Sequence, residues 1–270
     1  MGRRTLKLYS DTPDLDTQLL LSEVLDQTRT WILAHPEVKL EETQQHNFLS
    51  DLSRCEAGEA LPYVLGWWEF FGRRFQLNPE VLIPRPETEL LIEEALCFLV
   101  NHPYEQMAMD VGTGCGCIAI TLAVEVPNLF VVATDLESGA LRVARNNAID
   151  HRVLHRICFI QADLLSPLNA SFDLICANLP YIPSEDLPDL VVAEREPRIA
   201  LDGGEDGTQV IQRLMTQIPG LLKPHGRILL EIGADQAKAI HTIAQKTFPS
   251  STIEVHQDLA GRDRLVVIDR

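Results

Sequence analysis

The sequence lacks the features of a membrane-spanning, exported or disulfide-stabilised protein. No apolar run approaches the roughly eighteen residues that a membrane span needs, and no apolar stretch follows the basic start Met1–Arg4, so neither a span nor a targeting segment is expected. The six cysteines have no paired metal-type spacing, and only Cys115 and Cys117 lie close together. We interpret the cysteines as buried free thiols in a reducing cytoplasm and expect no metal site.

Positive charge is also scarce. Lys and Arg total 23 against 39 Asp and Glu, which gives a net charge of -16. Such a surface repels a phosphate backbone, so a stable nucleic-acid partner is disfavoured and a folded protein or a small neutral or cationic ligand is favoured. The 270 residues, 46% of them hydrophobic, suffice for one full-sized core and a smaller accessory domain.

The N-terminal part has a helical pattern that changes before residue 60. Apolar residues recur at three- and four-residue steps from Asp16 to Ser53, which predicts a small helical domain over 1–57. Residues 58–85 combine aromatic and β-prone residues with Gly and Pro, and they predict a linker that contains a β-hairpin. The pattern after Pro86 is helical again, with Thr88 as a possible cap, so a second domain is expected over 86–270.

Strand and helix patterns alternate through this second domain. Strands are predicted at 107–111, 130–134, 157–161, 174–177 and 227–232, and helices at 117–126, 138–148, 210–222 and 235–248. This alternation predicts an α/β fold with a doubly wound parallel sheet. Two further strands at 252–257 and 264–268, separated by a turn that contains Gly261, predict an antiparallel hairpin that closes the sheet.

A glycine-rich turn follows the first predicted strand of this domain. Its glycines, Gly112, Gly114 and Gly116, alternate with Thr113 and Cys115. Glycine allows a ligand to approach the backbone closely, but a structural turn would look similar. In a dinucleotide site, with the pattern G-x-G-x-x-G, the third glycine comes later than it does here, and the helix N-terminus holds a pyrophosphate. The alternating spacing therefore disfavours a dinucleotide.

Acidic residues follow the next two strands at the same edge of the sheet. Asp135 comes about twenty residues after the glycines, where a carboxylate can accept hydrogen bonds from both ribose hydroxyls. Asp163, which precedes Leu164, follows the strand at 157–161 and is a candidate acceptor for an adenine amino group, with a simple turn or cap as the alternative. Together with the glycine turn, these residues favour a nucleoside cofactor.

The tetrapeptide Asn178-Leu179-Pro180-Tyr181 directly follows the strand at 174–177, so it is expected beside the glycine turn. An amide or aromatic amine nitrogen has a delocalised lone pair, so a site that methylates it should accept hydrogen bonds from both N–H groups. The Asn178 side-chain oxygen and the Leu179 carbonyl are the candidate acceptors. Pro180 would stiffen the turn and Tyr181 would pack on the flat target group. An ordinary Asn-x-Pro loop is the alternative.

These motifs together resemble the release-factor glutamine methyltransferases. The resemblance includes the leading helices and the segments 84–89 (Pro-Arg-Pro-Glu-Thr-Glu), 110–116, 178–181, 196–201 and 261–264. It implies a class I methyltransferase (Rossmann-like) domain preceded by a small helical domain. It further implies an enzyme that transfers a methyl group from S-adenosylmethionine to the side-chain amide nitrogen of a glutamine in a peptide chain release factor, with S-adenosylhomocysteine as product.

Residue roles follow from these motifs. In the family, segment 84–89 lines the cleft shared by cofactor and substrate, which implies the same for Arg85, Pro86, Glu87 and Glu89; a rigid linker with a helix cap is the alternative. The expected cofactor-binding residues are Gly112, Thr113, Gly114, Cys115, Gly116, Asp135, Asp163, Leu164 and Asn178. The expected catalytic residues are Asn178, Leu179, Pro180 and Tyr181, which also bind substrate with Arg85, Pro86 and Glu87.

One departure from the family concerns Leu179, because the family usually has proline there. The backbone carbonyl remains, but the fixed φ of proline is lost. The form Asn-Leu-Pro-Tyr also occurs in ribosomal RNA adenine dimethyltransferases, so an N6-adenine methyltransferase acting on ribosomal RNA is the main alternative. The acidic N-terminal region and segment 84–89 oppose it. A non-catalytic S-adenosylmethionine-binding module is a further alternative.

Three smaller expectations concern the surroundings of the site. The charged cluster Glu194, Arg195, Glu196 and Arg198 is interpreted as a solvated, salt-bridged loop that could rim the substrate entrance. The helical domain is expected to add contacts with the protein substrate, because one side chain buries too little surface to define a partner. The protein is expected to be a cytoplasmic monomer.

Overall fold

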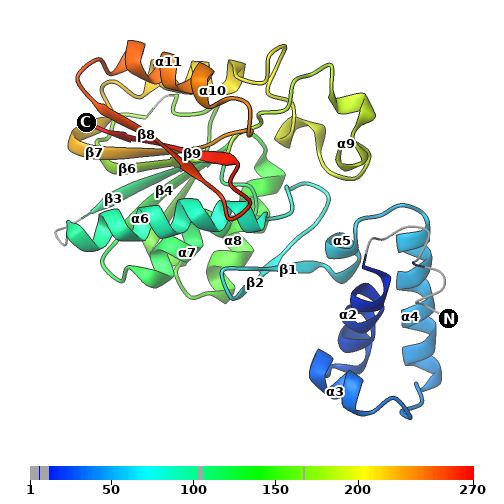
Figure 1. Ribbon diagram of the computed structural model, residues 1–270. Coiled ribbons are helices and arrows are strands. Elements are labelled where there is room, and N and C mark those ends of the chain that lie inside the picture. Colours follow the sequence, from blue (N-terminus) through cyan, green and yellow to red (C-terminus); the bar gives the residue numbers. More distant parts are fainter. Residues whose placement is uncertain (1–5, 7–11, 103–105, 167) are drawn as a thin grey trace. The chain divides into compact units, whose positions relative to one another are not determined.

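The computed structural model describes residues 6, 12–102, 106–166 and 168–270, and the chain forms two compact units, Met1–Trp68 and Glu69–Arg270 (Figure 1). The first unit contains the helices α2 (Pro13–Leu25), α3 (Arg29–Ala34), α4 (Glu42–Glu56) and α5 (Leu61–Leu65). Its small core contains Leu20, Phe48 and Leu52. The helix α5 lies inside the predicted linker, and Pro62 in its first turn favours a helix start at this point.

A two-stranded hairpin follows α5, as the aromatic and glycine-containing segment predicts. It consists of β1 (Trp67–Phe70) and β2 (Arg73–Gln76). The two residues between the strands, Phe71 and Gly72, have φ angles of 50° and 68°. Two successive residues with positive φ are typical of the tight turns that match the twist of a hairpin.

The second unit is built on a seven-stranded sheet with the order β5-β4-β3-β6-β7-β9-β8. Its strands are β3 (Met107–Val111), β4 (Phe130–Asp135), β5 (Ile157–Gln161), β6 (Phe172–Ala177), β7 (Leu222–Glu231), β8 (Thr252–Gln257) and β9 (Asp263–Asp269). The strands β3 to β7 pair in parallel, whereas β9 pairs antiparallel with both β7 and β8. The predicted doubly wound sheet with an antiparallel C-terminal hairpin is confirmed.

Helices cover both faces of this sheet. The helices α10 (Gln209–Gln217) and α11 (Ala237–Thr247) lie on one face, and α6 (Glu89–Asn101), α7 (Cys117–Glu125) and α8 (Ser138–Asp150) lie on the other (Figure 1). The remaining helical segments are η1 (Pro86–Thr88), η2 (Leu154–Arg156), η3 (Leu187–Asp189), α9 (Val191–Arg195) and η4 (Arg198–Ala200). No helix among the described residues combines the length and the apolar character that a membrane crossing requires.

Several local predictions were wrong. The helix predicted at 210–222 ends at Gln217, because Pro219 and Gly220 follow, and β7 begins at Leu222 rather than at 227. Thr88 stands at the N-cap position of α6 but makes no side-chain cap hydrogen bond. The cysteines are not all buried. Cys158, on the edge strand β5, and Cys97 are exposed.

Candidate active site

The glycine turn between β3 and α7 depends on left-handed backbone conformations. The φ angles of Gly112, Gly114 and Gly116 are 72°, 55° and 86°, which L-residues with a Cβ rarely adopt. A Cβ on Gly116 would lie 2.8 Å from Ile120 Cδ1, so this glycine lets α7 pack closely. A Cβ on Gly114 would meet nothing within 4 Å, so this part of the turn is open to a ligand.

Asp110, the residue before this turn in β3, fixes its geometry. One oxygen, Oδ2, accepts hydrogen bonds from Thr113 Oγ1 at 2.6 Å and from the Ala119 backbone N–H at 3.1 Å. The other oxygen, Oδ1, is buried without a hydrogen-bond partner among the described residues. Complete burial raises the pKa of Asp110 to about 7, although the hydrogen bonds from Thr113 and Ala119 oppose the shift.

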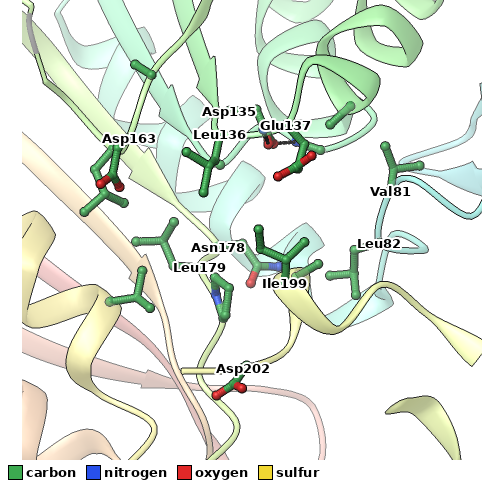
Figure 2. Close-up of a pocket in the computed structure, with 18 of the residues that line it drawn as sticks. Val81, Leu82, Asp135, Leu136, Glu137, Asp163, Asn178, Leu179, Ile199 and Asp202 are labelled. Carbon is green, nitrogen blue, oxygen red and sulfur yellow. Dashed lines mark hydrogen bonds between the residues drawn. The ribbon is translucent and has the colours of Figure 1, made fainter. Parts of the chain in front are cut away.

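A cavity of about 230 Å³ opens beside this turn (Figure 2). Predicted site residues in its lining are Gly112, Gly114, Asp135, Asp163, Leu164, Asn178, Leu179 and Pro180. They come from the ends of β3, β4, β5 and β6, because the carboxyl ends of parallel strands meet at one edge of the sheet. Several apolar residues, among them Leu136, Ala140 and Val210, complete much of the wall.

Thr113, Cys115 and Gly116 do not belong to this lining. Thr113 and Cys115 are buried, and each supports the turn. The Thr113 backbone N–H donates to the Thr134 carbonyl at 2.8 Å, and the Cys115 carbonyl accepts from Asn147 Nδ2 at 2.8 Å. Both residues thus support the turn, and their contact with a cofactor stays a prediction.

Asp135 lies between the glycine turn and α8. Its Oδ2 accepts from the Gly114 backbone N–H and its Oδ1 from the Glu137 backbone N–H, both at 2.9 Å. Burial raises the pKa of Asp135, while these backbone hydrogen bonds oppose the shift. Each carboxylate oxygen has a second lone pair, so both can still accept a hydrogen bond from a ligand in the cavity.

Asp163 is exposed and forms an ion pair with Arg213 of α10. Both side chains are about half exposed and both line the cavity. Arg213 contacts Oδ2 of Asp163, which leaves Oδ1 available for an adenine amino group. Sequence reasoning missed Arg213, because 50 residues separate it from Asp163.

The Asn178 side chain belongs to a hydrogen-bonded chain of three residues. Its Nδ2 donates to Thr88 Oγ1 at 3.0 Å, and Thr88 Oγ1 donates to Glu231 Oε2 at 2.7 Å. Thr88 and Glu231 are buried, with 1% and 2% of their surfaces exposed, whereas Asn178 reaches the cavity. Sequence reasoning did not assign Glu231 to the site. The one sequence feature that could have indicated Glu231 is the position of its carboxylate directly after the apolar run 228–230.

The rest of the tetrapeptide is held on both sides. The Leu179 side chain is 4% exposed, and its Cδ2 would lie 2.9 Å from a Cβ on Gly112, so it packs directly against the glycine turn. The Tyr181 carbonyl accepts from Gln236 Nε2 at 2.8 Å. Tyr181 itself is outside the cavity lining, and burial raises the pKa of its hydroxyl.

The segment 84–89 does not line this cavity. Arg85 forms an ion pair with Glu196, Pro86 and Glu87 are exposed, and Glu89 Oε1 accepts from the Phe71 backbone N–H at 2.8 Å. The interpretation of the cluster at 194–198 as a solvated loop was wrong for Glu196, whose side chain is 5% exposed. Instead, the preceding residues Glu80, Val81 and Leu82 form part of the cavity wall (Figure 2).

The sheet order and this cavity define a class I methyltransferase fold. Residues 88–195 match the family model described as methyltransferase small domain, and residues 1–66 match the PrmC N-terminal domain. A solved structure, ribosomal protein L11 methylase from Lactobacillus delbrueckii subsp. bulgaricus, is 22% identical with a TM-score of 0.50, and the alignment covers 75% of this chain and 88% of that chain. At this identity the likeness shows the fold alone.

Sequence relatives define the family more narrowly. The release factor glutamine methyltransferase of Moorella thermoacetica is 39% identical over 257 residues, which cover 94% of this chain and 90% of the relative. That of Bacillus cereus is 37% identical over 256 residues, with 92% and 90% covered. The chain belongs to the release factor glutamine methyltransferase family, as the sequence motifs predict.

Proposed function

We propose that this chain transfers a methyl group from S-adenosylmethionine to the side-chain amide nitrogen of a glutamine in a peptide chain release factor. The observation that carries this proposal is the orientation of Asn178. Its Nδ2 is occupied by Thr88, so its Oδ1 is available to accept a hydrogen bond from a target amide. The family relatives are named for this reaction.

The cavity fits the cofactor. Gly114 leaves space beside the turn, the two Asp135 oxygens can accept from the ribose hydroxyls, and Asp163 Oδ1 is available for the adenine amino group. Leu136, Ala140 and Leu164 supply apolar surface for a flat base. When bound, S-adenosylmethionine supplies a methyl group on a positively charged sulfur and leaves as S-adenosylhomocysteine.

Catalysis by these residues is mainly positioning. Asn178 Oδ1 and the Leu179 carbonyl would each accept one N–H of the target amide, which directs the nitrogen lone pair toward the methyl carbon. The excess proton leaves the nitrogen for solvent after transfer, so no strong base is required. Arg85, Pro86, Glu87 and Tyr181 would contact the substrate outside the cavity lining, and the N-terminal helical domain (1–57) would add contacts with the release factor in the cytoplasm.

Methyl transfer from labelled S-adenosylmethionine tests the proposal. We expect label on a purified release factor, and none on the same factor after its exposed loop glutamine is replaced. Asn178→Ala should lose most transfer, roughly a hundredfold or more by comparison with other donors and acceptors that act in the transition state, and should retain cofactor affinity. Label on ribosomal RNA alone would favour the RNA-modifying alternative, and cofactor binding without any transfer would favour a binding module.

A further inference from the structure

The polarity of the Asn178 side chain decides whether it can bind a target amide. A carboxamide has an accepting oxygen at one end and a donating NH₂ group at the other. With the oxygen toward the target, Asn178 accepts its N–H. With the NH₂ group toward the target, two donors face each other and the target nitrogen is repelled. The site therefore needs hydrogen-bond partners that distinguish the oxygen from the NH₂ group of Asn178.

Thr88 and Glu231 provide a hydrogen-bonded chain with a direction. A carboxylate only accepts hydrogen bonds, so the single hydroxyl proton of Thr88 points to Glu231 Oε2 at 2.7 Å. The Thr88 oxygen can then only accept, and the donor at 3.0 Å must be the Asn178 NH₂ group. Because Thr88 and Glu231 are both buried, water has little access to replace either partner.

We propose that Thr88 and Glu231 are positioning residues that hold the Asn178 side-chain oxygen toward the target amide. The inference rests on the proposed function. It gives a buried acid in β7 and a hydroxyl at the start of α6 a common role in the reaction, although neither residue touches the substrate. The Thr88 hydroxyl thus has Glu231 and Asn178 as its partners, and it makes no cap hydrogen bond to the α6 backbone.

Protonation of Glu231 would reverse this direction. A protonated Glu231 can donate to Thr88 Oγ1, whose own proton would then point to Asn178 and favour the opposite amide orientation. The charged and titratable groups that act on Glu231 are Arg264 of β9, Arg85 and Glu87 in and next to η1, Tyr181, and Cys117 of α7. Thr88 adds a hydrogen bond to the carboxylate. Burial dominates these and raises the pKa of Glu231 to about 7, so methyl transfer should decline as the pH falls below neutral.

Thr88→Val is the first test, because it removes the hydroxyl and preserves the shape. We expect kcat for release-factor methylation to fall roughly ten- to a hundredfold, by analogy with the residues that orient metal ligands from the outer shell, with the Kd of S-adenosylmethionine within twofold. Thr88→Ser should restore most of kcat. Thr121→Val is the matched control, since Thr121 is buried in α7 and its hydroxyl has no hydrogen-bond partner among the described residues.

Glu231→Gln provides a second readout, the pH profile, that a purely structural role would not change. We expect kcat to be reduced in this variant. The amide side chain does not titrate in this range, so the decline of kcat on the acid side of neutral should disappear. Full kcat in folded Thr88→Val, or an unchanged acid limb in Glu231→Gln, would overturn the inference. Failure of the wild-type chain to methylate any release factor would instead overturn the proposed function.

Discussion

Arg85 and Glu196 form an ion pair across 111 residues of sequence, with Nη2 and Oε1 2.5 Å apart. Glu196 is almost fully buried, and its second oxygen accepts from the Ile83 backbone N–H at 3.0 Å. One carboxylate thus binds both the side chain and the backbone of the segment that enters α6. This contact joins that segment to the loop between α9 and η4.

Replacing Glu196 by Ala should destabilise the protein and impair substrate binding. The Ile83 N–H and the partly buried guanidinium lose their acceptor, which costs about 1–3 kcal/mol of unfolding free energy. Chemical denaturation checks this loss, and release-factor kinetics should show a raised KM. Glu194→Ala is the control, because Glu194 lies two residues before Glu196, in α9, and is exposed. Equal effects of the two variants would contradict a specific role for Glu196.

Substitutions of Gly114 and Gly116 should differ in their effects on the unfolding free energy and on cofactor affinity. Gly114→Ala and Gly116→Ala both place a Cβ at positive φ, which costs about 1–2 kcal/mol. Only Gly116→Ala also brings the Cβ to within 2.8 Å of Ile120 Cδ1 and 3.1 Å of Ala144 Cβ, so it should lower the unfolding free energy further. Calorimetric titration should show the larger relative loss of S-adenosylmethionine affinity for Gly114→Ala. A lower unfolding free energy for Gly114→Ala than for Gly116→Ala would exclude this explanation.

Hydrophobic periodicity was sufficient to predict the sheet and the edge at which the site forms. Residues such as Asp135 and Asn178 directly follow predicted strands, and parallel strands bring their carboxyl ends together whatever their separation in sequence. The partners of these residues were not predictable in the same way. The bonds Thr88–Glu231 and Asp163–Arg213 join residues 143 and 50 positions apart, and no local pattern specifies such pairs.

The predicted segment boundaries were wrong where local sequence preference and tertiary contacts compete. The sequence 210–222 continues a helical pattern, but Pro219 and the pairing of Leu222 with Phe172 of β6 end the helix early and extend β7. Glu196 was misassigned because a cluster of charges is usually solvated. Buried Glu196 accepts a hydrogen bond from the backbone of residue 83. The sequence alone does not show that these two residues lie close together.

Asp135→Asn should weaken cofactor binding. Both Asp135 oxygens accept backbone N–H groups, and asparagine can replace only one of them as an acceptor. The variant therefore disturbs the turn and loses charge-assisted hydrogen bonds to the ribose, each worth about 1.5–3 kcal/mol. We expect the Kd of S-adenosylmethionine to rise at least about tenfold in calorimetric titration. Glu137→Gln, an exposed position in the same lining, should change it much less.

The pH dependence of stability should reveal the buried Asp110. Its pKa is raised from 3.8 to about 7 in the folded state, so the folded protein holds this proton more tightly than the unfolded chain. The resulting stabilisation is complete below pH 3.8 and is lost as the pH rises through 7, a change of about 4 kcal/mol in unfolding free energy. Asp110→Asn removes this titration and keeps an acceptor for Thr113 and Ala119.

The difference in unfolding free energy between Asp110→Asn and the wild type should therefore shift in favour of the variant between pH 5 and pH 8.5. Denaturant titrations at several pH values measure it. Glu231, whose pKa is also raised to about 7, titrates in both proteins and cancels in the difference. Asp189→Asn, the same substitution at an exposed position, is the control. A constant difference between Asp110→Asn and the wild type over this range would show that this carboxyl stays ionised in the folded protein, and that the glycine turn is supported by a buried charge.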